Sequence, residues 1–272
     1  MIVPVPAADD PRIAEYRDVR ERDLVGRQGR FIAEGEVVLR LLAAQVDADG
    51  RTAQGHRLLS LLLSQGQAER LSDLLAALPS HMPVHVAPQD VMDAIVGFPI
   101  HRGILALGVA RQEVPAQALL AGLGERALVV AVSGIANHDN MGGIFRNAAA
   151  FGADLVLLDR ACCDPLYRKA IRVSVGASLI VPFARLADAD AMLAALAAAG
   201  VGVVALSPSG RERLSAVVPP PRVAALFGAE GPGLPTRVLA AARTVAIPMA
   251  PGFDSLNVAT TSGIVLHHLA GA

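Results

Sequence analysis

The sequence predicts an α/β fold with a parallel sheet that is covered by helices on both faces. Two observations support this prediction. From Arg126 onward, short unbroken apolar runs of strand length alternate with helical segments. In addition, 53% of the 272 residues are hydrophobic and only 18% are charged, which excludes disorder as the dominant state. A chain of this length suits one large domain or two ordinary ones.

The strands and helices of this second part are expected in a regular order. We predict strands at 127–132, 154–158, 201–206, 223–227 and 245–248, and helices at 142–151, at 191–199, from about 235, and at 256–269. Strands that are buried on both faces of a sheet read as continuous apolar runs, as these do. Ligand sites in such sheets lie at the carboxyl ends of the strands, so the loops that follow the strands are the places to look for chemistry.

The first third of the chain differs from the rest. Segment 12–30 holds six arginines mixed with acids. This pattern is typical of a solvated, salt-bridged helix or, alternatively, of a surface that contacts RNA phosphates. A short strand, a glycine turn and an apolar helix follow within 31–43. We divide the chain into a small α/β domain at 1–110, a glycine- and proline-containing linker at 111–125, and a larger domain at 126–272.

Charge and composition exclude several classes of protein. The 24 Lys and Arg residues nearly balance the 25 Asp and Glu residues, so the chain is not a globally basic nucleic-acid binder. Aromatic residues, at 3%, are too scarce for a protein that stacks single-stranded bases on aromatic rings. The uncharged run 191–210 is interrupted by Gly200 and Gly202, so no membrane span is expected.

The cysteines and histidines indicate where the protein acts. Cys162 and Cys163 are adjacent, and two cysteines form neither a disulfide framework nor a zinc site. The histidines show no metal-ligand spacing, and the N-terminus lacks the features of a signal peptide. We therefore expect a protein of the reducing cytoplasm, with no metal and no membrane partner.

The first loop of chemical interest is 137–147, Asn-His-Asp-Asn-Met-Gly-Gly-Ile-Phe-Arg-Asn. Asn137 or Asn140 can cap the following helix, but capping explains only one of the two. Arg146 stands among small and apolar residues on the first turns of that helix. It either extends over its apolar neighbours or pairs with an acid, or it faces a polyanion or a developing oxyanion.

The second and third loops are each ambiguous by themselves. Residues 226–235 carry glycines that either let a ligand approach the backbone or form a plain turn, and they match neither the dinucleotide fingerprint nor a P-loop. In the third loop, 247–260, Ser255 and Asn257 stand at a helix start, where either can be a cap. No Gly-x-Ser-x-Gly elbow surrounds Ser255, so it is not predicted to be a triad nucleophile.

Taken together, the order and spacing of the three loops resemble the signature motifs of the SpoU (TrmH-like) branch of the SPOUT RNA methyltransferases. The resemblance covers about 128–269. It extends weakly to 11–13, 29–36 and 101–106, which look like the small RNA-binding domain, similar to a ribosomal-protein fold, that often precedes the catalytic one. It implies S-adenosylmethionine (SAM) as methyl donor and a ribose 2′-hydroxyl in tRNA or rRNA as acceptor. It also implies a homodimer, in which a partner chain completes each site, and a SPOUT-type sheet with a deep C-terminal trefoil knot.

The resemblance also implies roles for individual residues. The implied catalytic positions are Asn140, Arg146, Glu230, Ser255 and Asn257. The implied cofactor-binding positions are Gly228, Ile247, Leu256 and, held more loosely, Leu206. In this family the counterpart of Arg146 is proposed to help remove the hydroxyl proton, but arginine normally stays protonated, so stabilising the emerging alkoxide is the more conservative role. A basic cluster either contacts phosphates or is ordinary surface: Arg168, Lys169 and Arg172.

Two departures from the family pattern leave its catalytic groups in place. His138 stands where Pro is usual, and Ala259-Thr-Thr stands where Ser-Val-Ala is commoner. One alternative function is a non-catalytic RNA-binding or ribosome-assembly protein that retains the fold, against which the intact set of catalytic positions argues. Another is an unrelated nucleotide-using enzyme, against which the missing Gly-x-Gly-x-x-Gly argues.

Overall fold

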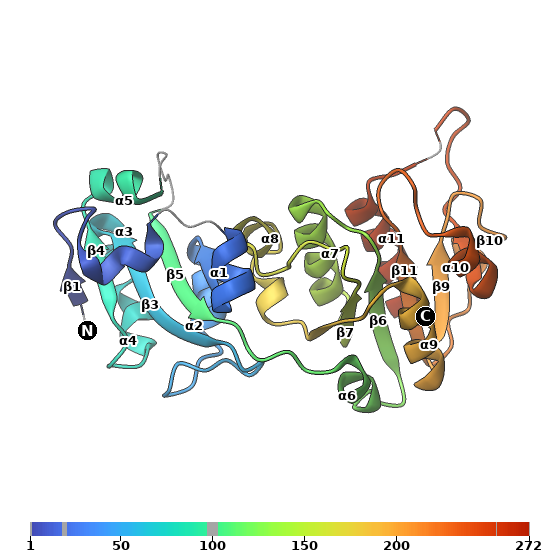
Figure 1. Ribbon diagram of the computed structural model, residues 1–272, viewed down its shortest axis with the longest axis horizontal. Helices are drawn as coiled ribbons and strands as arrows, with labels where there is room; N and C mark the ends of the chain where they lie inside the picture. The colour runs from blue at the N-terminus through green and yellow to red at the C-terminus, as the bar shows by residue number, and fades with distance from the viewer. Residues whose placement is uncertain (1, 18–20, 97–102, 254, 272) are drawn as a thin grey trace. The chain divides into compact units, whose positions relative to one another are not determined.

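The computed structural model describes residues 2–17, 21–96, 103–253 and 255–271. These residues divide into two compact units (Figure 1). The first unit comprises Met1–Gln112 and Leu166–Ile180, and the second comprises Glu113–Pro165 and Val181–Ala272. No helix in the described ranges combines the length and the apolar character needed to cross a membrane.

The first unit is built on a five-stranded mixed sheet with the order β1-β4-β3-β5-β2. Its strands are β1 (Ile2–Pro4), β2 (Arg30–Glu34), β3 (Arg57–Ser64), β4 (Val84–Ala87) and β5 (Ile104–Val109). Strand β5 runs antiparallel to both β2 and β3, whereas β4 runs parallel to both β1 and β3. Its helices are η1 (Pro11–Tyr16), α1 (Glu21–Gln28), α2 (Glu36–Ala43), α3 (Gln65–Arg70), α4 (Ser72–Ala77), α5 (Gln89–Val96), α8 (Arg168–Val173) and η2 (Ala177–Leu179).

The prediction of one salt-bridged helix across 12–30 is wrong in its extent. The described part of this segment forms η1, α1 and the first residue of β2. Two of its arginines are nevertheless paired with acids, because Arg12 binds Asp10 and Arg30 binds Glu15. The segment cannot stay helical to its end, since Arg30 is already paired with Val109 in the sheet. Arg20, and residues 101–102 of the weak family resemblance, lie outside the described residues.

The second unit contains a seven-stranded sheet with the order β10-β12-β9-β11-β6-β7-β8, in which every pairing is parallel. This confirms the predicted parallel sheet. The strands are β6 (Ala127–Val132), β7 (Leu155–Leu158), β8 (Phe183–Arg185), β9 (Gly202–Leu206), β10 (Glu212–Arg213), β11 (Arg222–Phe227) and β12 (Arg243–Ala246). The helices are α6 (Ala116–Ala121), α7 (His138–Ala150), α9 (Ala189–Ala198), α10 (Thr236–Ala241), α11 (Val258–Ala270) and the short η3 (Leu214–Ala216).

The core of the second unit explains why its strands are so apolar. All six residues of β6 are buried, because the strand lies in the middle of the sheet. Side chains of β6, β7 and β11 form one cluster with side chains of α6, α9 and α10, while α11 packs against β11 and α7. Helix α6 falls inside the segment that the sequence predicts as a linker.

The strand order determines where the three loops of interest meet. Strands β9, β11 and β6 are consecutive neighbours, and β12 lies beside β9. Because all four are parallel, their carboxyl ends share one edge of the sheet, and the loops that leave them begin side by side. The four segments are 133–137, 207–211, 228–235 and 247–257. The first leads into α7, which begins at His138 and not at the predicted 142, so Asn140 and Arg146 lie on this helix.

Candidate active site

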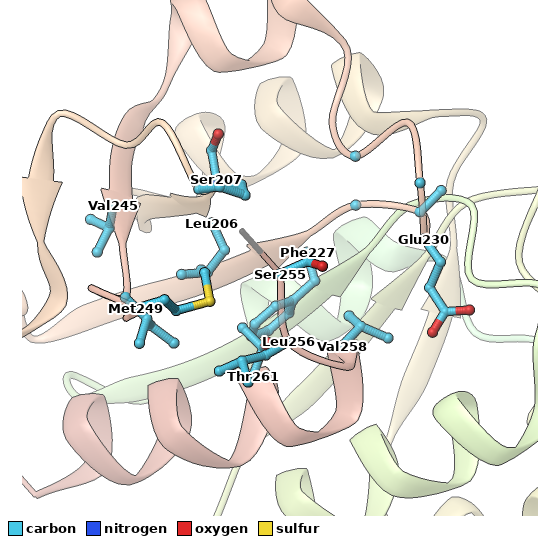
Figure 2. A pocket seen from close by; sticks show the side chains of 16 residues that line it. Leu206, Ser207, Phe227, Glu230, Val245, Met249, Ser255, Leu256, Val258 and Thr261 are labelled. Carbon is cyan, nitrogen blue, oxygen red and sulfur yellow. The ribbon is translucent and has the colours of Figure 1, made fainter. Parts of the chain in front are cut away.

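A cavity of about 190 Å³ lies among the loops that follow β9, β11 and β12 (Figure 2). Its walls are mostly apolar, with Leu206, Met249 and Leu256 close together in Figure 2. Glu230 contributes the only charge among the described residues that line it. The cavity is also lined by the following predicted site residues: Leu206, Gly228, Glu230, Ile247, Ser255 and Leu256.

The glycine loop after β11 folds back on itself. A Cβ at Gly228 would lie 2.4 Å from the carbonyl carbon of Gly233, so only glycine fits this close backbone approach. Gly231 and Gly233 have φ values of +83° and +68°, which disfavour other residues. The N–H of Gly233 donates to the carbonyl of Ala229 at 3.0 Å and closes the turn. These glycines therefore shape the cavity wall by shaping the loop.

A chain of side-chain hydrogen bonds joins the first turn of α7 to the loops that follow β11 and β12. The Nδ2 of Asn140 donates to Oε1 of Glu230, and the Nδ2 of Asn257 donates to Oδ1 of Asn140 at 2.8 Å. Asn140 is 5% exposed, whereas Glu230 and Asn257 are exposed. A buried amide thus connects one residue from each of the other two loops. We call Glu230, Asn140 and Asn257 the amide chain.

Helix capping sets the orientation of the amide chain. The Oδ1 of Asn257 accepts from the backbone N–H groups of Ala259 and Thr260, at 2.9 and 3.2 Å, and so caps α11. The Nδ2 of Asn257 must then face Asn140 as a donor, which makes the Oδ1 of Asn140 the acceptor. The remaining NH₂ of Asn140 points at a carboxylate, the acceptor that binds an N–H donor most strongly.

Asn137 caps α7, as one of the two sequence alternatives predicts. Its Oδ1 accepts from the N–H of Asp139 at 2.7 Å. Arg146 lies on the same helix and is exposed. Its side chain makes no hydrogen bond or ion pair with any described residue, and it does not line the cavity. The structure therefore gathers Asn140, Glu230 and Asn257 together and leaves Arg146 apart from them.

Asn147 is a residue of this site that the sequence analysis does not single out. Its Nδ2 donates to the carbonyl of Ala259 at 2.7 Å and to Oγ of Ser262 at 2.9 Å, which ties α7 to α11. The helices approach closely here, because a Cβ on Gly143 would lie 2.6 Å from the Cβ of Ala259. Asn147 follows Asn140 by two helical turns and so shares its face of α7, which is the signal that could have revealed it.

Asp159 is a second residue that the sequence analysis misses. It is 4% exposed, and it accepts from the hydroxyl of Ser133 at 2.6 Å and from the N–H of Gly134 at 3.1 Å. The carboxylate therefore holds the end of β6, just before the loop that leads into α7 and Asn140. Burial raises the pKa of the neighbouring Cys162 thiol to about 12 and that of Cys163 to about 11. Both thiols are therefore protonated and unreactive near neutral pH.

The predicted RNA-contacting residues lie on α8, in the first unit. The Nε of Arg168 donates to Oε2 of Glu34 at 2.9 Å, and Nη1 of Arg172 lies 3.8 Å from the same oxygen. Glu34 is 4% exposed, so this pair fastens α8 to β2. Lys169 is exposed. Arg168 thus has a structural partner, whatever else it contacts.

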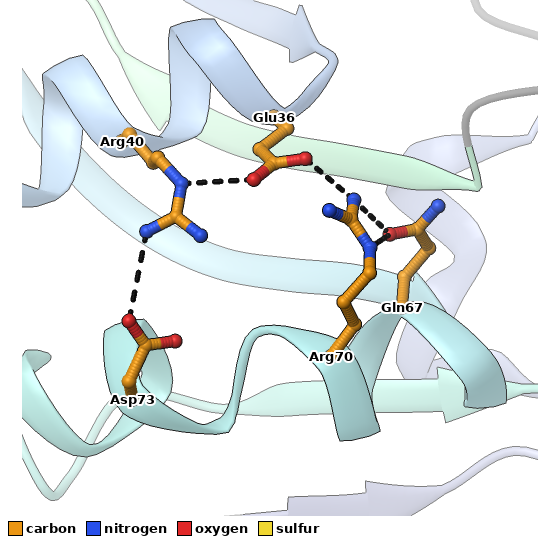
Figure 3. A network of polar contacts seen from close by, with 5 residues as sticks. All are labelled: Glu36, Arg40, Gln67, Arg70 and Asp73. Carbon is orange, nitrogen blue, oxygen red and sulfur yellow. Dashed lines mark hydrogen bonds and ion pairs between the residues drawn. The ribbon is translucent and has the colours of Figure 1, made fainter.

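Other arginines of the first unit are also bound to acids (Figure 3). Both carboxylate oxygens of Glu36 accept from arginines, one from Nε of Arg40 at 2.9 Å and the other from Nη2 of Arg70 at 2.5 Å. The hydrogen bonds from Arg70 and Arg40 hold the pKa of the Glu36 carboxyl below its ordinary value. Arg40 also lies 3.7 Å from Asp73. This network joins α2 to α3 and α4, so its arginines contribute little uncompensated charge.

Similar proteins share this fold across nearly the whole chain. An uncharacterized tRNA/rRNA methyltransferase of Mycobacterium bovis is 37% identical over 269 residues, which cover 95% of this chain and 88% of that protein. An AdoMet-bound rRNA methyltransferase from Sinorhizobium meliloti superposes with a TM-score of 0.78 at 24% identity, covering 98% of this chain and 97% of that one. For an RNA 2′-O ribose methyltransferase the TM-score is 0.74 at 24% identity, with coverage of 98% and 97%.

The two superpositions establish the fold, and the sequence comparisons establish the family. The model of the SpoU rRNA Methylase family matches residues 127–267, which include all three loops and the whole amide chain. The resemblance inferred from those loops is therefore confirmed. On this match and on the identity with the mycobacterial relative, the chain belongs to the SpoU rRNA Methylase family.

Proposed function

We propose that the protein transfers a methyl group from SAM to a ribose 2′-hydroxyl of tRNA or rRNA. One observation carries this proposal: the amide chain connects three loops at the side of an apolar cavity. The loops are far apart in the sequence and supply amide, carboxylate and hydroxyl groups to one edge of the sheet. That edge is where ligands bind in parallel sheets.

The lining and the charge of the cavity suit SAM. Leu206 and Leu256 offer apolar walls for the adenine ring, and the backbone at Gly228 and Ile247 can hydrogen-bond its polar edge and the methionine part. When bound, SAM supplies a methyl group on a positively charged sulfur. Glu230 gives the cavity a negative charge and, among its described lining residues, no basic side chain opposes it. A cationic ligand is therefore favoured over an anionic one.

The polar residues have separate roles in the proposed reaction. In-line transfer needs the hydroxyl oxygen roughly 3 Å from the methyl carbon, so the ribose must be held firmly. Ser255, in the cavity wall, and Asn257, fixed by its cap, position the ribose. Arg146 stabilises the emerging alkoxide or grips the adjacent phosphate. Its exposure and its lack of a partner among the described residues leave its charge available for RNA.

The proposal includes the assembly of the protein and its contacts with RNA. We assign RNA recognition to the first unit, where Lys169 and Arg172 of α8 are candidates for phosphate contacts and Arg168 holds the helix in place. We further propose that two copies form a homodimer, in which each copy completes the other's site. The loops at 228–235 and 247–257 are proposed to form a deep trefoil knot.

The test is methyl transfer from radiolabelled SAM to tRNA and to large-subunit rRNA. Arg146→Ala should lower turnover by about 100-fold or more, while SAM affinity measured by calorimetry stays within a few-fold. The matched control is Arg213→Ala, because Arg213 is also exposed in the second unit but lies outside the three predicted loops. Unchanged turnover of Arg146→Ala would refute its role.

The acceptor atom is tested on the product. A methyl group on the 2′-oxygen blocks alkaline cleavage of the adjacent phosphodiester, so the labelled position should resist hydrolysis and appear as a 2′-O-methyl nucleoside. Label on a base would contradict the ribose assignment. SAM binding without transfer to either RNA would favour the non-catalytic alternative. Mapping the 2′-O-methyl sites lost in a deletion strain would then identify the nucleotide.

A further inference from the structure

A second cavity, of about 220 Å³, adjoins the first at Ser207, which lines both. Its polar lining consists of one guanidinium and four hydroxyl groups, and no acidic side chain is among the described residues around it. The residues that supply these groups are Ser207, Ser209, Arg211, Thr236 and Thr244. We call this cavity the hydroxyl pocket.

The wall of the hydroxyl pocket is pinned in place. The N–H of Ser207 donates to the carbonyl of Val245 at 3.0 Å, and the N–H of Arg211 donates to Oγ1 of Thr244 at 3.2 Å. Between them, Gly210 lies so close to β12 that a Cβ would stand 2.3 Å from the carbonyl carbon of Val245. The backbone of the loop after β9 is thus fastened to β12 along its length, which fixes where the side chains of this wall begin.

Arg211 differs from Arg237 and Arg243 in having no partner for its side chain among the described residues. Arg237 binds Asp190 at 2.7 Å, and Arg243 binds Glu212 at 2.6 Å. The Arg211 side chain makes no hydrogen bond or ion pair with any described residue. An uncompensated guanidinium beside several hydroxyl groups is the chemistry that recognises a phosphate, since both supply N–H or O–H donors to its oxygens.

We propose that the hydroxyl pocket binds a backbone phosphate of the RNA substrate. This inference rests on the proposed function, because it places RNA directly beside the cofactor cavity, at the loop that lines both. The acidic cofactor cavity and the basic hydroxyl pocket lie on either side of Ser207. The two cavities therefore separate the two ligands by charge: the cationic SAM binds in the cofactor cavity, and the polyanionic RNA is held at the hydroxyl pocket. Arg, Ser and Thr side chains are among the groups that contact phosphates in such complexes.

The test compares Arg211→Ala with Arg213→Ala, an exposed arginine two residues away that does not line the pocket. Binding of bulk tRNA and of protein-free large-subunit rRNA is measured by filter binding between about 50 and 200 mM salt. Arg211→Ala should weaken binding of the RNA that the protein uses as its substrate by about 5- to 10-fold. It should also reduce the slope of log affinity against log salt concentration by about 0.7 to 0.9. Arg213→Ala should change the affinity by less than about 2-fold.

A second variant separates the pocket from general charge. Thr236→Val removes one lining hydroxyl at nearly constant volume, and it should weaken RNA binding by a few-fold without changing the salt slope. Equal RNA affinities of the Arg211 and Arg213 variants, in a protein that methylates RNA, would overturn the phosphate site and leave the proposed function intact. Loss of SAM affinity in Arg211→Ala would also overturn it, because the pocket would then hold the cofactor's carboxylate. A wild-type protein that binds neither RNA would overturn both.

Discussion

Truncation of Asn140 is the sharpest test of the amide chain. Asn140→Ala removes one hydrogen bond to the Glu230 carboxylate and another from Asn257. We expect the free energy of unfolding to fall by about 1–2 kcal/mol. The loss stays this small because Glu230 and Asn257 are exposed and regain hydrogen bonds from water. Methyl transfer should fall much further, since the three loops lose the group that joins them.

Double-mutant cycles give the magnitude for each hydrogen bond. The coupling between Asn140 and Glu230 should be about 1–2 kcal/mol, because the acceptor is charged. The coupling between Asn140 and Asn257 should be about 0.5–1 kcal/mol, because both groups are neutral. Alanine single and double variants are measured by urea unfolding at neutral pH and by SAM calorimetry.

The outcome that would refute this reasoning is additivity. If the double variants equal the sums of the single variants within about 0.3 kcal/mol, the amide chain is not an energetic unit. Asn257→Asp serves as the control for the cap, because the carboxylate still accepts from the start of α11 but no longer donates to Asn140. It should retain the helix and lose the coupling.

Two further predictions concern buried titratable groups. Burial, aided by the charge of Arg111, lowers the pKa of His56 from 6.5 to about 4. At pH 5 the imidazole of His56 is therefore neutral in the folded protein, whereas in the unfolded chain it binds a proton. Lowering the pH from 7 to 5 should therefore reduce the free energy of unfolding of the first unit, measured with urea, by about 2 kcal/mol. His56→Asn should remove this loss. The control His81→Asn, at an exposed position, should leave it unchanged. Cys162 and Cys163 should resist a thiol reagent at pH 8 until the protein unfolds, and rapid labelling of the folded protein would contradict this. Because their pKa values are raised from 9.0 in the folded protein, the unfolded chain loses these protons first, so the free energy of unfolding should fall as the pH rises above 9.0.

The sheet of the second unit could be predicted because its signal is local. The run 127–132 is uniformly apolar, and the structure places β6 on these same residues, buried on both faces. The predicted strands at 201–206 and 223–227 agree with β9 and β11 to within one residue. Continuous apolar runs of this length are required by a strand in the middle of a parallel sheet, so pattern and structure coincide.

The sequence could not predict that α8 belongs to the first unit, because the contacts that place it there join residues far apart in the chain. Residues 166–180 stand between strands of the second unit in the sequence, yet they pack with the first unit. Their decisive partner is Glu34, which is 134 residues from Arg168. Nothing in the basic run itself indicates that one of its arginines is matched by a buried carboxylate so far away. The same limit applies to the amide chain, whose members lie 90 and 117 residues apart.

The structure also changes how capping and function relate at this site. From the sequence, a helix cap and a catalytic role are competing explanations for Asn257. In the structure its Oδ1 caps α11 while its Nδ2 donates to Asn140, so one side chain both caps the helix and belongs to the amide chain. The cap fixes the Asn257 amide with its NH₂ toward Asn140, and this in turn fixes the Asn140 amide with its NH₂ toward Glu230. A capping asparagine is therefore well suited to this position, because the helix N-terminus holds its side chain in place before any ligand binds.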